Sequence, residues 1–174
     1  MEAPGFSTER YYTGIGSRKT PPEILEWMTK IAILLYGQGY ILRSGGAEGA
    51  DSAFEAGAGD RKEIFLPWKG FNKNPSPLYP PSEKAIKMAC AIHPLGDKLE
   101  RAHKLLHGRN MHQVLGREIG DSKPSQFILC WTPGVGGTVT ALTAAHHHHI
   151  PVFNLFVDPT SWWDDFLKIS QEVL

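Results

Sequence analysis

Three glycine-rich segments contain the residues of this 174-residue chain that are best suited to chemistry. They are residues 14–18 (GIGSR), 44–49 (SGGAEG) and 133–138 (PGVGGT). Glycine lets backbone N–H groups approach a phosphate without a Cβ in the way. Each segment also precedes an expected helix, whose N-terminus adds unpaired donors and a partial positive charge. One such loop is weak evidence, because tight turns also need glycine, but three together favour a site for a phosphate-bearing ligand.

Polar side chains in and near these segments could contact the same ligand. Arg18 could hold a phosphate through a bidentate contact, or it could be a solvated surface residue. Ser44 and Thr138 could donate to a phosphate or cap the following helix, and these two roles are compatible. Arg109 and Asn110 suit recognition of a phosphate and a base, with a simple helix junction as the alternative.

Two carboxylates and a tryptophan complete the candidate set. Glu48 and Asp51 lie at the start of an expected helix, where a negative charge suits the helix dipole. Their functional alternative is recognition of a ribose hydroxyl, and Glu48 is the candidate catalytic base for N-glycosidic cleavage. Trp68 could stack on a base or pack in the core. The expected ligand-binding residues are Gly14, Gly16, Ser17, Arg18, Ser44, Gly45, Gly46, Ala47, Glu48, Gly49, Asp51, Trp68, Arg109, Asn110, Thr132, Pro133, Gly134, Gly136, Gly137 and Thr138.

Four consecutive histidines, residues 146–149, form the most visible run in the chain. Neighbouring residues of a helix point in different directions, so only His146 and His149 have the spacing that puts two ligands on one face. No Cys or His elsewhere completes a zinc pattern. We expect a polar helix end here, no metal site, and no required cofactor beyond a nucleotide-type ligand.

Short apolar runs alternate with longer amphipathic segments along the chain. The apolar runs predict strands at residues 10–16, 40–43, 63–68, 126–131 and 151–156. The amphipathic segments predict helices at residues 21–37, 52–59, 83–91, 95–119 (interrupted near Gly108), 138–145 and 161–174. Strands that alternate with helices form βαβ units around a parallel sheet. The sequence therefore predicts an α/β fold, a Rossmann-like three-layer sandwich with a mainly parallel sheet of about five strands.

This architecture would bring the candidate residues together. The loops that follow parallel strands all lie at the carboxyl edge of the sheet, where ligands bind. Residues 69–82 are rich in Pro, Asn, Lys and Ser and are expected to form a loop of the kind that often covers a ligand.

Composition limits the class of protein. The length suits one domain, residues 1–174, and 18 basic residues balance 18 acidic ones. A formal charge of zero argues against a dedicated nucleic-acid coat but leaves room for a local basic groove. Cys90 and Cys130 lie in apolar surroundings and are typical of buried thiols in a reducing compartment. With no secretory pattern at the start and no run of roughly 20 apolar residues, we expect a cytoplasmic protein that does not bind membranes.

The motifs resemble the SLOG superfamily, which joins the DNA-processing protein A (DprA) family and the Lonely guy (LOG) phosphoribohydrolases. Residues 43–51 (RSGGAEGAD) are similar to the Arg-Ser-Gly-Gly-Ala signature of the first family. Residues 108–110 resemble its Arg-Asn step, which opens a helix, and residues 136–141 resemble its Ser-Gly-Thr-Ala segment. Residues 133–138 also resemble the phosphoribohydrolase loop. The phosphoribohydrolases place a catalytic glutamate just after the Gly-Thr pair, where this chain has Val139 and Thr140.

The resemblance implies one leading function and two alternatives. The leading one is binding of a nucleotide or nucleotide-derived small molecule, such as a signalling nucleotide sequestered or degraded in a phage or defence setting. The first alternative is single-stranded DNA binding as a minimal DprA-like recombination mediator. The second is LOG-like N-glycosidic hydrolysis of nucleoside monophosphates. The resemblance also implies a homo-oligomer, for which the tryptophans at 162 and 163 of the amphipathic tail are candidate contacts, with closure of the monomer core as the equal alternative.

Overall fold

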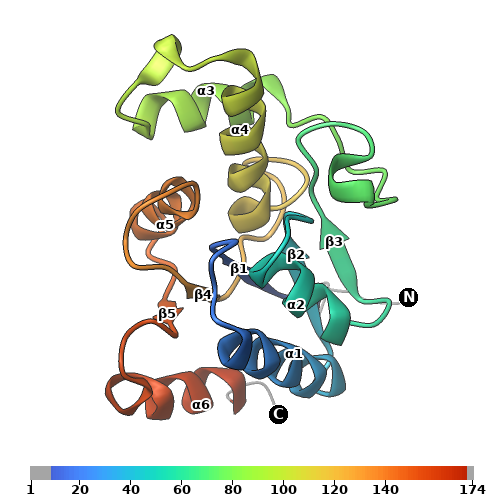
Figure 1. The fold of residues 1–174 in the computed structure, drawn as a ribbon, viewed down its shortest axis with the longest axis vertical. Coiled ribbons are helices and arrows are strands. Elements are labelled where there is room, and N and C mark those ends of the chain that lie inside the picture. Colours follow the sequence, from blue (N-terminus) through green and yellow to red (C-terminus); the bar gives the residue numbers. More distant parts are fainter. Residues whose placement is uncertain (1–8, 172–174) are drawn as a thin grey trace, which may run out of the picture.

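The computed structural model describes residues 9–171 and has an all-parallel sheet of five strands between two layers of helices (Figure 1). The strands are β1 (Arg10–Gly16), β2 (Tyr40–Ser44), β3 (Lys62–Ile64), β4 (Ile128–Trp131) and β5 (Val152–Asn154). Their spatial order is β3-β2-β1-β4-β5, so the chain winds outward from β1 and then returns to its other side. This arrangement confirms the predicted Rossmann-like sandwich.

One face of the sheet is covered by α1 (Pro22–Gly37), α2 (Ala50–Gly57) and α6 (Trp163–Gln171). Figure 1 shows α1 and α6 side by side, and Trp27 contacts Trp163 edge to face. The strands contribute a buried aromatic cluster to this layer, in which Tyr12 stacks on Phe127 with 5.8 Å between ring centroids. Trp162 and Trp163 pack against the same cluster, and the homo-oligomer expected from them stays a prediction.

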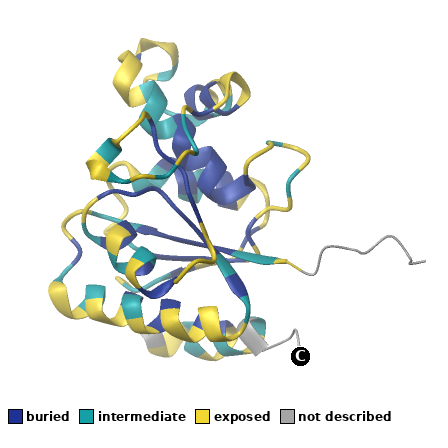
Figure 2. Cartoon of the chain, turned by 90° about the vertical axis from the view of Figure 1, so that its right-hand side faces the viewer, coloured by how far each residue is buried: buried dark blue, intermediate teal, exposed yellow. Residues whose placement is uncertain are grey.

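The other face carries α4 (Arg101–Leu115) and α5 (Thr138–His147). Val114 and Ala141 of these helices pack against Ile15 and Cys130 of the strands. Outside them lies α3 (Glu83–Ile92), which packs on α4. Figure 2 shows that the strands and the sheet-facing part of α4 are buried, whereas the outer surfaces of the helices are exposed. This layer therefore supplies both core residues and one wall of the candidate site.

The break that the sequence pattern predicts near Gly108 is wrong, because α4 runs continuously through this residue. A Cβ at Gly108 would lie 2.9 Å from Ile86 Cγ1 and 3.2 Å from Pro81 Cβ. The glycine therefore allows α3 and the segment before it to approach α4, and it does not end a helix. The α4 helix is also shorter than the predicted 95–119, since it is preceded by a short 3₁₀ turn, Gly96–Lys98.

The third strand is shorter than predicted. It covers Lys62–Ile64, and the following Phe65 forms only an isolated bridge to Leu78. The predicted loop at 69–82 contains a 3₁₀ turn, Phe71–Lys73. The predicted C-terminal helix extends to residue 174, and its last three residues lie outside the described part of the chain. Within the described part, none of the helices has the length and apolarity needed to cross a membrane.

The packing of α2 on β1 generates a stability prediction. A Cβ at Gly14 would lie 2.5 Å from Cγ of Phe54, whose ring is fully buried. We expect Gly14→Ala to lower the free energy of unfolding by about 1–3 kcal/mol, because the buried ring must shift. Chemical denaturation measures this change. Gly37→Ala is the control, since a Cβ there has no neighbour within 4 Å, and an equal loss in both variants would contradict the explanation.

Candidate functional site

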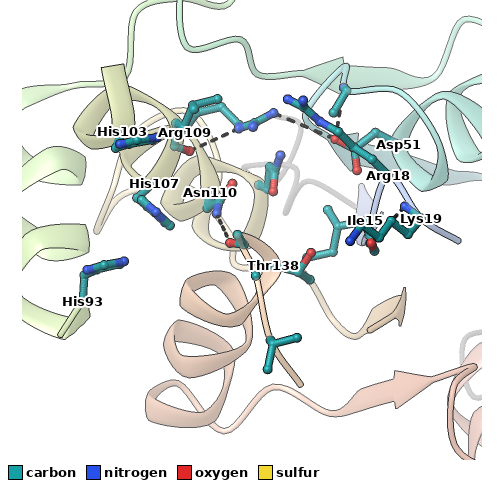
Figure 3. A pocket seen from close by; sticks show the side chains of 18 residues that line it. Ile15, Arg18, Lys19, Asp51, His93, His103, His107, Arg109, Asn110 and Thr138 are labelled. Atoms are coloured by element: carbon teal, nitrogen blue, oxygen red, sulfur yellow. Dashed lines mark hydrogen bonds and ion pairs between the residues drawn. The ribbon is translucent and has the colours of Figure 1, made fainter. Parts of the chain in front are cut away.

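A cavity of about 610 Å³ lies at the carboxyl edge of the sheet, beside the ends of β1 and β4 (Figure 3). The direction of winding reverses between these two strands, and such a reversal point is where open α/β sheets bind ligands. The volume falls within the range of about 300–1,000 Å³ that is usual for small-molecule sites. The lining residues are Ile15, Gly16, Ser17, Arg18, Lys19, Ala47, Asp51, His93, His103, Leu106, His107, Arg109, Asn110, Gln113, Val135, Gly136, Gly137 and Thr138.

Half of the predicted ligand-binding residues line this cavity. They come from the loop after β1, the start of α2, the middle of α4 and the loop before α5, and they are Gly16, Ser17, Arg18, Ala47, Asp51, Arg109, Asn110, Gly136, Gly137 and Thr138. The other half lie outside its lining: Gly14, Ser44, Gly45, Gly46, Glu48, Gly49, Trp68, Thr132, Pro133 and Gly134. The structure therefore brings segments from four distant parts of the sequence to one place.

Arg109 is the most constrained charged residue of the cavity. Its guanidinium donates to the carbonyl oxygen of Gly45 and lies 3.9 Å from the carboxylate of Asp51. Its cationic carbon also lies 5.5 Å from the ring centroid of Phe71. A Cβ at Gly45 would lie 2.1 Å from the guanidinium, so only glycine permits this approach. The glycine-rich segment after β2 thus positions an arginine of α4.

Asn110 joins α4 to the start of α5. Its amide donates to the carbonyl oxygen of Gly137 at 2.8 Å and to the hydroxyl of Thr140 at 3.0 Å. The same hydroxyl lies 2.9 Å from Nδ1 of His107. These contacts place the N-terminus of the ten-residue helix α5 beside the α4 wall of the cavity. A helix N-terminus in this position offers free amide donors to an anion.

The loop before α5 is held at its base and open at its tip. The side chain of Asn154 in β5 accepts from the amide of Thr132 at 3.1 Å and donates to its carbonyl oxygen at 2.8 Å. The Thr132 hydroxyl in turn accepts from the amide of Gly134. By contrast, a Cβ at Gly134, Gly136 or Gly137 would meet no atom within 4 Å. Thr132 therefore shapes the loop, while the glycines leave the backbone accessible to a ligand.

Several candidate residues outside the lining have structural roles. The Ser44 hydroxyl is buried and donates to the carbonyl oxygen of Gly14 at 2.6 Å. Gly49 has φ +82, and a Cβ there would lie 2.9 Å from the backbone of Arg18. The Glu48 side chain is exposed, so the predicted catalytic glutamate does not face the cavity. Trp68 is 39% exposed and contacts Phe71 edge to face.

The arginine that begins the signature-like segment is also structural. Arg43 is 1% exposed, and its Nε donates to the carboxylate of Glu63 at 3.0 Å. Its guanidinium carbon lies 3.8 Å from the ring centroid of Tyr11, and Arg117 donates to the second oxygen of Glu63. This group links β1, β2, β3 and the segment after α4, and it lies outside the cavity lining.

Residues that the sequence pattern did not single out also line the cavity. Lys19 adds a second cation beside Arg18, and His93, His103 and His107 form the wall on the α4 side. The spacing of four between the last two was an available signal, because it puts both on one helix face. The run at 146–149 lies outside the lining, and its four side chains are exposed. Among residues 9–171, no group of three or more His, Cys, Asp or Glu could hold a metal ion.

Comparison with solved structures shows which fold this architecture shares. The chain is similar to DNA processing protein A from Helicobacter pylori, a structure described for its unique single-stranded DNA binding mode. The TM-score is 0.56 at 15% sequence identity, and the match covers 94% of this chain and 78% of that one. This chain therefore has a DprA-like fold. Neither a protein-family model nor a curated protein sequence matches it.

The buried carboxylate of the cavity generates a pH prediction. Burial raises the pKa of Asp51 from 3.8 to about 6, despite the opposing effects of Arg109 and of the Ala47 amide. Because its pKa is raised, Asp51 still holds a proton in the folded state at pH values where it has lost that proton in the unfolded state. The free energy of unfolding therefore falls as pH rises through the window from about 4 to about 6.

We expect Asp51→Asn to gain stability relative to the wild type by about 2 kcal/mol between pH 4 and pH 7, because asparagine has no charge to bury. Urea denaturation of both proteins across this range measures the difference. The substitution also changes the partner of Arg109, which shifts the stability of the variant at every pH. Only the change in the difference with pH tests the titration of Asp51. Parallel pH profiles of the two proteins would show that Asp51 titrates normally in the folded state.

Proposed function

We propose that the cavity binds a nucleotide or a nucleotide-derived small molecule through its phosphate. The observation that carries this proposal is the convergence of Arg18, Lys19 and the N-terminus of α5 in one cavity at the reversal point of the sheet. In Figure 3, Arg18 and Lys19 lie on one side of this cavity and Thr138 near its centre. Two exposed cations and the backbone donors of a helix N-terminus are complementary to a phosphate.

The local charge supports an anionic ligand, although the whole chain is formally neutral. The lining includes three fixed cations, Arg18, Lys19 and Arg109, and a single carboxylate, Asp51. That carboxylate already pairs with Arg109 at 3.9 Å. Arg18 and Lys19 are exposed and make no ion pair among the described residues, so their charge is available to a ligand.

The types of side chain in the lining favour a single nucleotide over a long strand. The lining contains no Phe, Tyr or Trp, whereas proteins that bind single strands without sequence preference use aromatic side chains as stacking platforms. Leu106 and Val135 are the more exposed of the four apolar lining residues, Ile15, Ala47, Leu106 and Val135, and could contact a base or sugar. The proposal is limited to binding, because Glu48 lies outside the lining and the positions after Thr138 hold Val139 and Thr140.

Removing the exposed cations tests the proposal. We expect Arg18→Gln and Lys19→Gln each to weaken nucleoside 5′-monophosphate binding by about tenfold or more, because a charge-assisted hydrogen bond contributes about 1.5–3 kcal/mol. Isothermal titration calorimetry with the four ribonucleotides measures the affinity. The matched control is Lys87→Gln, an exposed lysine of α3 outside the cavity. Wild-type protein that binds no nucleotide, or variants that bind as tightly as the control, would refute the proposal.

Single-stranded DNA binding is the second candidate, and the fold similarity to H. pylori DNA processing protein A is the observation that favours it. In this case the same two exposed cations would contact successive backbone phosphates, in place of one phosphate inside the cavity. The two candidates differ in how steeply the affinity depends on salt, because a strand releases more counterions than a mononucleotide.

For this candidate we expect an oligonucleotide of about 12 residues to bind far more weakly as salt increases. Each of Arg18→Gln and Lys19→Gln would reduce the slope of log K against log salt by about 0.7. Fluorescence anisotropy with a labelled strand measures both quantities. Absence of any binding at low salt would remove this candidate and leave the nucleotide proposal as it stands.

A further inference from the structure

The cavity has a second polar wall, formed by three histidines on the side away from Arg18 and Lys19 (Figure 3). His103 and His107 are four residues apart on α4, so they occupy the same face of the helix. His93 follows directly after α3, and its ring centroid lies 4.6 Å from that of His107. The packing of α3 on α4 thus gathers imidazoles from two helices at one end of the site.

This histidine wall is not part of the core, and among the described residues it has no acidic partner that would complete a metal site. His103 is exposed, and His93 and His107 are only partly buried, so the rings are not part of the core. Asp51 is the one carboxylate in the lining, and it pairs with Arg109. In residues 9–171 no cluster of His, Cys, Asp or Glu could hold a metal ion. Imidazoles grouped without an acidic partner are complementary to an anion.

We propose that the histidine wall is a second anion site, so that the ligand is a nucleotide with two separate phosphate groups. This inference rests on the proposed function: one phosphate binds at Arg18, Lys19 and the N-terminus of α5. The other phosphate binds at the three histidines, and its binding is coupled to proton uptake at His107.

Hydrogen bonds within the protein determine which ring nitrogen of His93 and His107 is left to contact a ligand. Nδ1 of His93 accepts from the backbone amide of Leu95 at 3.1 Å, so the neutral ring carries its proton on Nε2. Nδ1 of His107 lies 2.9 Å from the Thr140 hydroxyl. In both rings Nδ1 is occupied by a protein group, which leaves Nε2 as the atom that can donate to a phosphate oxygen.

The surroundings of His107 oppose its protonation when no anion is present. Burial, together with the neighbouring His93, His103 and Arg109, lowers the pKa of His107 from 6.5 to about 4. A bound phosphate would counter these repulsions and raise that pKa, so protein and phosphate would take up a proton together. Affinity for the second phosphate must then increase as pH falls. Asp51 also loses its charge in this range, whereas Arg18 and Lys19 keep theirs, so the test must separate the histidines from Asp51.

The experiment compares the 5′-monophosphates and 3′,5′-bisphosphates of the four ribonucleosides by calorimetry at about pH 7.5 and about pH 5.5. We expect the bisphosphate to bind about tenfold or more tightly than the monophosphate at the lower pH, with a smaller difference at the higher pH. In the double variant His103→Gln/His107→Asn the ratio of bisphosphate to monophosphate affinity falls to about one at both pH values, whatever the variant does to monophosphate binding itself. Heats measured in buffers of different ionisation enthalpy should show proton uptake that disappears in the double variant.

Two controls make the result specific. His147→Gln removes an exposed histidine of α5 outside the cavity and should leave all affinities unchanged. Asp51→Asn should retain the histidine-dependent proton uptake, which separates the two titrating groups. A phosphate monoester itself takes up a proton near a pKa of about 6, so the proton uptake with the bisphosphate is compared with that measured for the monophosphate in the same protein.

The possible outcomes separate the second anion site from the proposed nucleotide binding. If monophosphates bind but bisphosphates bind no more tightly, or if the double variant keeps the full advantage and proton uptake, the second anion site is refuted and the proposed function stands. If neither class of nucleotide binds the wild type, both are refuted. A circular dichroism spectrum and melting curve equal to wild type confirm that the double variant is folded, and Asn at 107 keeps a polar partner for Thr140.

Discussion

The cavity depends on the close approach of α4 to the loop after β2. A Cβ at Gly45 would lie 1.9 Å from Nε2 of Gln113 and 2.1 Å from the guanidinium of Arg109, so this contact exists only because the residue is glycine. The approach places Arg109 against the Gly45 carbonyl and Asp51, and it aligns the next residue of α4, Asn110, with the start of α5. The glycine therefore leaves room for the side-chain ends of Gln113 and Arg109 beside the backbone of this loop.

Charge is distributed unevenly in a chain whose formal charge is zero. On the side of β3, the two carboxylate oxygens of Glu63 accept hydrogen bonds from Arg43 and Arg117, so the charges of these side chains are paired. At the carboxyl edge the cations outnumber the single carboxylate. Neutral composition is therefore compatible with a cavity whose lining carries an excess of positive charge, because basic and acidic side chains are paired in one region and unbalanced in another.

Sequence reasoning predicted the sheet, and half of the residues it singled out line the cavity, for identifiable reasons. Glycine loops after apolar strands locate the carboxyl edge because parallel topology requires it. Gly108 was misread because its role is a tertiary contact with Ile86, which no local pattern reveals. The histidine wall was missed for a similar reason, since only the packing of α3 on α4 brings His93 to His107. The run at 146–149 was more visible in the sequence, yet the structure leaves it exposed.

The loop before α5 has a consequence for the rates of exchange. Asn154 fixes its base through both backbone groups of Thr132, and Asn110 holds the carbonyl oxygen of Gly137, whereas no side chain packs over the tip at Gly134 or Gly136. Glycine loses more conformational freedom on ordering than any other residue, so a ligand that immobilises the tip gives up part of its interaction free energy. A ligand should consequently dissociate faster from this site than from one that makes the same contacts through a rigid loop. Such a site suits a ligand that must be released readily after it is bound.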